Sequence, residues 1–252
     1  MLRVDYERVQ YRQYAATRAL TAEALDGWLD AFERRSPEQR PLAVLDLGSG
    51  TGRFTPGLAR RFGGPVFGVE PAEAMLRQAP AADGITYLQG NAEQIPLRDA
   101  SVDLVLMFLS FHHVTDRAAA GREVARVLRP GGRLLVRTAL GDQLPDLLWH
   151  RFFPGAKAVE ARVFPTYDEL VASFGTLTPV AHDHVPDPYA PSFQAYSQRL
   201  KRHAISTFEH LSAEEIAHGD ALVDAAVDAA VARGDHAGPV IETADLVTFA
   251  RP

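Results

Sequence analysis

The chain has 252 residues, of which 46% are apolar and 23% charged, and its formal net charge is −6. This length allows one or two domains with a sizeable core, and the acidic balance argues against nucleic acid as a partner, because proteins that bind nucleic acid normally present a basic face. Without cysteine, no disulfide and no thiolate metal site can form. No apolar run reaches the ~20 residues of a membrane span, and the N-terminus MLRVDYERVQYR is too charged for a signal peptide. We therefore expect a cytoplasmic protein without a membrane partner.

Two helices are predicted before the first strand. In the first, helical spacing brings Tyr11, Tyr14 and Arg18 onto one face. The second runs from Thr21 to Arg34, with Thr21 as its N-cap.

Residues 42–46 (LAVLD) read as a buried strand, which leads into a glycine-rich turn and then a helical pattern up to Ala59. Strand, glycine turn and helix in this order open a nucleotide-binding βαβ unit, in which glycines with positive φ let the ligand approach the backbone. The glycines fall as GxGxG and not as the GxGxxG of dinucleotide-binding proteins. Asp46 precedes them, and its carboxylate would repel a pyrophosphate but attract an ammonium or sulfonium group. This combination favours S-adenosylmethionine, which carries both cations and no phosphate.

Further strands are predicted at residues 66–70, 85–89, 102–108 and 128–136, with helical patterns between them. This alternation predicts a parallel sheet with helices on both faces. Two more strands are expected at 178–185 and 240–250, and residues 192–233 read as helical.

Residues 40–140 resemble the small-molecule branch of the class I S-adenosylmethionine-dependent methyltransferases. The resemblance implies an α/β, Rossmann-like, doubly wound sheet of seven strands in the order 3-2-1-4-5-7-6, with the last strand antiparallel. It implies a helical lid over residues 1–36 and a methyltransferase domain over 37–252, with a helical substrate cap inserted at about 141–176 and 186–236. It also implies methyl transfer from S-adenosylmethionine to the oxygen, nitrogen or carbon of a small-molecule substrate, with S-adenosylhomocysteine as the product.

The resemblance assigns a cofactor role to residues at the strand ends. Glu70 would accept both ribose hydroxyls, and Asn91, where the family usually has Asp, would hold the adenine. Arg18 either pairs with the cofactor carboxylate or forms a surface ion pair. The predicted cofactor-binding residues are Arg18, Asp46, Gly48, Ser49, Gly50, Thr51, Gly52, Glu70, Pro71, Met75, Asn91, Ala92, Glu93 and Phe108.

Two histidines follow the fourth strand, in a segment similar to one where family members place a histidine near the acceptor. His112 is the preferred candidate for a general base and His113 the second, because the pKa of histidine lies near neutrality. The alternative is that His112 only packs or caps. Tyr14 either lines the reaction centre or is a core aromatic residue.

Substrate contacts are predicted from less specific signals. Arg137 ends a parallel strand, where side chains are usually apolar, so we expect it to face the cleft and meet a polar substrate group or a carboxylate. Tyr11, Trp149, Phe152 and Phe153 are aromatic candidates, although such clusters are more often core than pocket.

Two other polar clusters give less specific signals. His182 and His184 share one face of a strand, but no third ligand is apparent, so we predict no metal site. The basic turn Arg199, Lys201, Arg202 and His203 either receives an anionic acceptor or is a solvated face.

We also considered three other functions for a chain with these motifs. The bound cofactor could assist cyclisation, rearrangement or elimination without methyl transfer, or the chain could be a non-catalytic cofactor-binding subunit. Asp46 argues against a nucleotide-dependent oxidoreductase. The sequence indicates no particular oligomeric state.

Overall fold

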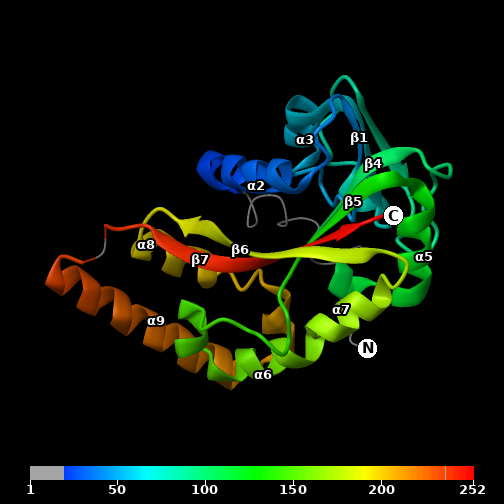
Figure 1. Cartoon of the computed structure of the whole chain (residues 1–252). Coiled ribbons are helices and arrows are strands. Elements are labelled where there is room, and N and C mark those ends of the chain that lie inside the picture. The colour runs from blue at the N-terminus through cyan, green and yellow to red at the C-terminus, as the bar shows by residue number, and fades with distance from the viewer. Residues whose placement is uncertain (1–19, 236) are drawn as a thin grey trace.

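The computed structural model describes residues 20–235 and 237–252, which form a seven-stranded sheet with helices on both faces (Figure 1). The strand order is β3-β2-β1-β4-β5-β7-β6, as predicted. Neighbouring strands from β3 to β5 pair in parallel, whereas β7 is antiparallel to both β5 and β6. The strands are β1 (Leu42–Leu47), β2 (Gly63–Glu70), β3 (Ile85–Gln89), β4 (Val102–Phe108), β5 (Leu128–Thr138), β6 (Thr178–Ala190) and β7 (Val240–Ala250).

The helices begin where the sequence offers caps. Thr21 is the N-cap of α2, as predicted, and Thr166 and Glu169 form a capping box at the start of α7. Among the described residues, no helix is long and apolar enough to span a membrane. The helices are α2 (Ala22–Arg35), α3 (Thr55–Phe62), α4 (Glu73–Leu76), α5 (Arg117–Val127), α6 (Pro154–Val163), α7 (Tyr167–Ser173), α8 (Phe193–Leu200) and α9 (Ala213–Arg233), with 3-10 turns η2 (Phe111–His113), η3 (Leu148–Arg151) and η4 (Ser206–His210).

Each face of the sheet has its own hydrophobic cluster. On one face, Trp28 of α2 and Leu58 of α3 pack with Leu104 of β4. On the other, Val124 of α5 and Leu170 of α7 pack in the cluster that includes β5 and β7. Thus α2 belongs to the layer that covers the sheet and not to a separate lid. The rest of the predicted lid, residues 1–19, lies outside the described residues.

The strands β6 and β7 extend beyond the rest of the sheet and carry the cap. β5 ends at Thr138, opposite Asp245, so residues 240–244 of β7 pair with β6 alone. Beyond this point η3, α6, α8, η4 and α9 enclose a third cluster around Trp149, Phe153 and Tyr196. Figure 1 shows α6 and α9 on the opposite side of the β6–β7 pair from α2.

The strand β6 continues to Ala190, five residues beyond the predicted end at Val185. In the sequence, Pro186 and Pro188 argue against this extension, because proline cannot donate a ladder hydrogen bond. However, β6 is an edge strand, paired with β7 only, and an edge tolerates proline. Residues 186–190 therefore belong to the sheet and not to the cap insertion.

Candidate functional site

The glycine-rich turn after β1 packs closely against the end of β4. Gly48, Gly50 and Gly52 all have positive φ. A Cβ on Gly48 would lie 2.4 Å from the Cβ of Ser110, so a side chain at this position would displace the loop after β4. The N–H groups of Gly48 and Ser49 both donate to the carbonyl of Val69, which ties the turn to the end of β2.

Glu70, the last residue of β2, is held rigidly beside this turn. Its carboxylate accepts hydrogen bonds from the N–H groups of Gly50 and Ala72, both at 3.0 Å. Burial raises the pKa of this carboxyl, while the two N–H groups act in the opposite direction. The two bonds fix the side chain where it lines a pocket, and carboxylate lone pairs remain for a ligand.

This pocket, here the glycine-loop pocket, contains most of the predicted cofactor residues. Gly48, Gly50, Glu70, Pro71, Met75, Asn91, Ala92, Glu93 and Phe108 line it. Ser49, Thr51 and Gly52 do not, and Arg18 lies outside the described residues. The lining residues that we did not predict are Leu47, Val69, Gly90, Met107, Leu109, Ser110, Val114 and Thr115, together with His113, which we had predicted in another role. Leu47, Gly90, Leu109 and Ser110 directly follow a predicted strand, and Val69 and Met107 are the next-to-last residues of one, which is the signal that could have identified them. His113, Val114 and Thr115 lie further along the loop after the fourth strand, where the sequence gives no such signal.

Asp46 is not in the place that we expected. It is only 3% exposed, accepts a hydrogen bond from the Thr55 hydroxyl at 2.7 Å and is absent from the pocket lining. Burial raises its pKa to about 6, against the opposing effects of the Thr55 hydrogen bond and the Arg53 charge. In this geometry Asp46 is not at the pocket surface, and its contact with a cationic ligand stays a prediction. Asp46 lies beneath the turn because its strand end is covered by the first residue of α3.

The segment after β3 closes the glycine-loop pocket. The Asn91 side-chain oxygen accepts the N–H of Gln94 at 2.9 Å. One Glu93 oxygen accepts the N–H groups of Thr115 and Asp116. These bonds connect the predicted adenine-binding segment to the loop that contains the two histidines.

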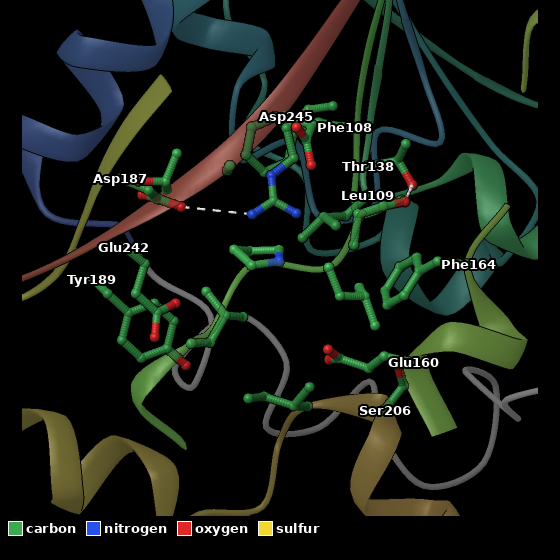
Figure 2. A pocket seen from close by; sticks show the side chains of 18 of the residues that line it. Phe108, Leu109, Thr138, Glu160, Phe164, Asp187, Tyr189, Ser206, Glu242 and Asp245 are labelled. Atoms are coloured by element: carbon green, nitrogen blue, oxygen red, sulfur yellow. Dashed lines mark hydrogen bonds and ion pairs between the residues drawn. The ribbon is translucent and has the colours of Figure 1, made fainter. Parts of the chain in front are cut away.

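A second pocket, here the cap pocket, lies between the carboxyl ends of β4 and β5 and the cap (Figure 2). Phe108 and Leu109 line both pockets and form the wall between them. Leu109 has a φ of 52°, which is unfavourable for a branched side chain, and its N–H donates to the carbonyl of Arg137. Strained residues of this kind concentrate at functional sites.

The neighbouring histidines of η2 face different pockets. His112 is buried and lines the cap pocket, where its ring lies 4.7 Å from that of Phe164. His113 lines the glycine-loop pocket. The two ring centroids are 3.9 Å apart. His112 thus lies on the cap-pocket side of the shared wall, and its role as a base stays a prediction.

Arg137 faces the cap pocket, as predicted. Its guanidinium lies 5.4 Å from the centre of the Phe108 ring and 3.7 Å from a carboxylate oxygen of Asp187 on β6. Burial lowers the pKa of Arg137, and the negative charges around it, Asp187 first, oppose that shift. The dashed line that starts at Asp187 in Figure 2 marks this ion pair.

The structure separates the predicted aromatic contacts. Trp149 lines the cap pocket, but Phe152 and Phe153 do not. Phe153 packs in the core of the cap, 4.9 Å from the Phe208 ring, because α9 approaches it closely at Gly219. Phe152 lies against Phe193. Tyr11 and Tyr14 lie outside the described residues.

The two minor clusters acquire partners. His182 and His184 both contact one oxygen of Asp245, at 2.8 and 3.1 Å, so a carboxylate not foreseen from the sequence joins the two imidazoles. In the basic turn, Lys201 pairs with Asp224, whereas Arg199 reaches the cap pocket.

Known proteins match both the sequence and the fold. A model of a methyltransferase domain matches residues 45–136. An uncharacterized methyltransferase of Mycobacterium tuberculosis is 50% identical over 113 residues, which are 44% of this chain and 42% of the relative. A malonyl-[acyl-carrier protein] O-methyltransferase of Methylococcus capsulatus is 38% identical over 130 residues, which are 50% of this chain and 46% of that protein. The chain thus spans less than half the length of these two relatives.

The fold is shared over most of the chain. The crystal structure of a putative methyltransferase from an antibiotic biosynthesis pathway of Anabaena variabilis has a TM-score of 0.73 at 21% identity, covering 92% of this chain and 98% of that one. The strand order agrees with this likeness, and the matched segment contains the glycine turn, Glu70, Asn91 and His112. Residues 45–136 therefore match a methyltransferase domain, and the strand order is the one expected from the resemblance to the class I S-adenosylmethionine-dependent methyltransferases.

Proposed function

We propose that this protein transfers a methyl group from S-adenosylmethionine to a small organic acceptor bound in the cap pocket. The observation that carries the proposal is the wall of Phe108 and Leu109, which line both pockets. A donor in one pocket and an acceptor in the other would meet at this wall, at the carboxyl end of β4. Ligands of open α/β sheets bind at such strand ends.

The glycine-loop pocket fits an adenosyl ligand. Gly48 and Gly50 line it without side chains, so a ligand can approach the backbone closely, and Glu70 is fixed by two N–H groups that leave carboxylate lone pairs for a ligand. Glu70 would accept the ribose hydroxyls, and Asn91 and the adjacent backbone would hold the adenine. When bound, S-adenosylmethionine supplies an electrophilic methyl group on a sulfonium.

The protein's own contribution is alignment, exclusion of water and proton transfer. Phe108 and Leu109 present apolar surface where the two ligands meet, which favours a dry, in-line approach. His112 lies on the acceptor side, so its imidazole would take the proton that a hydroxyl or amine loses as its bond to the methyl carbon forms. A positioned base of this kind contributes about 10²–10⁴-fold in rate.

Two measurements test the proposal. In thermal shift experiments, S-adenosylmethionine and S-adenosylhomocysteine should raise the melting temperature and NAD should not. With methyl-labelled S-adenosylmethionine and a library of small acceptors, label should appear in the product. If product forms while the label stays on the cofactor, the protein uses the cofactor for non-methylating chemistry and the proposal fails.

A further inference from the structure

Two carboxylates face each other across the extended β6–β7 pair. Asp187 of β6 is the direct cross-strand partner of Glu242 of β7, and both line the cap pocket. Figure 2 shows both side chains at the same side of the cavity. Like charges directly opposite each other on neighbouring strands destabilise a sheet, so this pair needs a compensating positive charge.

The described residues supply only part of that charge. Arg137 is 3.7 Å from one oxygen of Asp187, and the other oxygen, Oδ1, is buried and has no hydrogen-bond partner in the described part of the chain. Asp187 as a whole is 8% exposed. Glu242 accepts a hydrogen bond at 3.1 Å from the hydroxyl of Tyr196, a neutral donor. A buried, unpaired carboxylate oxygen is costly, which marks this end of the pocket as a place for a ligand.

The remaining charged groups of the pocket are engaged elsewhere. Glu160 contacts His150 at 2.9 Å, and Asp245 contacts His182 at 2.8 Å. Arg199 donates to the carbonyl of Tyr189 and lies over the ring of that residue. Arg53 lies over the ring of Phe108. At the Asp187–Glu242 end of the pocket, two facing carboxylates therefore share one nearby cation, Arg137.

We propose that Asp187 and Glu242 bind the protonated amino group of the acceptor, so that the substrates of this protein are small amines. The inference rests on the methyltransferase function proposed above and specifies its acceptor. An ammonium group supplies donors and a positive charge between the two carboxylates, and the aromatic residue Trp149 in the lining also favours a cation. Before transfer to this nitrogen, the ammonium proton passes to a carboxylate or to His112. The nitrogen then forms its bond to carbon as the carbon–sulfur bond breaks.

The ionisation of Glu242 supports the same inference. Burial raises its pKa to about 7, Asp187 and Glu160 add to the shift, and the Tyr196 hydrogen bond and the Arg137 charge oppose it. A bound cation favours the ionised form, so amine affinity should rise between pH 6 and pH 8 in the native protein. In the Glu242→Gln variant this rise should disappear.

The test uses the full chain saturated with S-adenosylhomocysteine and titrated by calorimetry at pH 8. Each of three probe sets compares an amine, an alcohol and a carboxylate on the same ring system. The sets are benzylamine, benzyl alcohol and benzoate; cyclohexylmethylamine, cyclohexylmethanol and cyclohexanecarboxylate; and tryptamine, tryptophol and indole-3-acetate. We expect the amine of at least one set to bind about tenfold or more tightly than its alcohol, and the carboxylate most weakly. Asp187→Asn and Glu242→Gln should each reduce that preference about tenfold.

The controls separate this inference from the function on which it rests. Asp224→Asn makes the same chemical change on an exposed position of α9 and should leave the preference unchanged. Each variant should still bind S-adenosylhomocysteine, which reports an intact fold. Equal binding of amines and alcohols in every set, or a preference that survives both pocket substitutions, overturns the inference. If the native protein does not bind S-adenosylhomocysteine, the proposed function fails instead, and the same probe comparison on the ligand-free protein still decides the inference.

Discussion

The glycine-loop pocket and the cap pocket share two residues but are built in different ways. The first uses backbone and strand ends within residues 47–115. The second collects side chains from α6, η4, the end of β5 and the extended ends of β6 and β7, over residues 20–245. A local, backbone-based site suits a ligand that many enzymes share, whereas a site of scattered side chains can vary with the acceptor. The predictions below test whether the two pockets are as separate in function as they are in construction.

The largest effect is expected at Glu70. Glu70→Ala removes the proposed acceptor for two ribose hydroxyls and leaves the N–H of Gly50 without its carboxylate partner. Hydrogen bonds to charged groups contribute about 1.5–3 kcal/mol each, so S-adenosylhomocysteine should bind about 10³-fold more weakly, or about 4 kcal/mol. Calorimetry measures this affinity. Glu73→Ala, three residues along the chain in an exposed ion pair with Arg77, is the control and should bind normally. Equal affinities of the two variants for S-adenosylhomocysteine would mean that the cofactor does not contact Glu70.

The contrast between the pockets also explains what the sequence could predict. The glycine turn, Glu70 and Asn91 follow strands that are recognisable by their apolar runs, so both the strand order and most of the first pocket could be predicted locally. The pairing of Asp187 with Glu242 could not, because it depends on the register of two strands far apart in the chain. Prolines concealed that register by making β6 look shorter than it is.

Burial was the other property that the pattern did not reveal. Trp149 and Phe153 belong to the same aromatic segment, and the sequence does not distinguish them. Phe153 packs against Gly219 of α9, whereas Trp149 lines the cap pocket. Asp46 precedes the glycine turn, as the sequence indicates, but Thr55 of α3 covers it, so it does not line the glycine-loop pocket.

The burial of Asp46 should make the free energy of unfolding depend on pH. Its pKa is about 6 in the folded protein and near 3.8 when the chain is unfolded, so the folded state binds the proton more tightly. The contribution of Asp46 to the free energy of unfolding is therefore greatest below pH 3.8 and falls as the pH rises to 6, by up to about 3 kcal/mol. Asp46→Asn keeps an acceptor for Thr55 and cannot ionise. Relative to the native protein, this variant should gain stability progressively between pH 4 and pH 7 in denaturant unfolding. A constant difference over that range would mean that the carboxyl is solvated.

The two histidines should separate the pockets kinetically. His112→Asn removes the imidazole from the cap pocket, and we expect kcat to fall about 10²-fold while the affinity for S-adenosylhomocysteine is unchanged. His113→Asn changes the glycine-loop pocket, so it should weaken that affinity with a smaller effect on kcat. Steady-state kinetics and calorimetry on both variants check the pair. The opposite pattern would exchange their roles, and full activity of His112→Asn would exclude this residue as the base.

The smallest effects are expected at two helical glycines, one in each half of the molecule. In α9, a Cβ on Gly219 would lie 2.1 Å from the Phe153 ring, so Gly219→Ala should overpack the core of the cap and reduce the free energy of unfolding by about 1–2 kcal/mol. In α2, a Cβ on Gly27 meets nothing within 4 Å, so Gly27→Ala should stabilise the sheet half by about 1 kcal/mol through helix propensity. Because neither residue lines a pocket, both variants should bind S-adenosylhomocysteine normally. Gly219→Ala could instead weaken cofactor binding as much as acceptor binding. The cap and the glycine-loop pocket would then be energetically coupled through the Phe108–Leu109 wall. In that case the two pockets would be separate in construction but not in function.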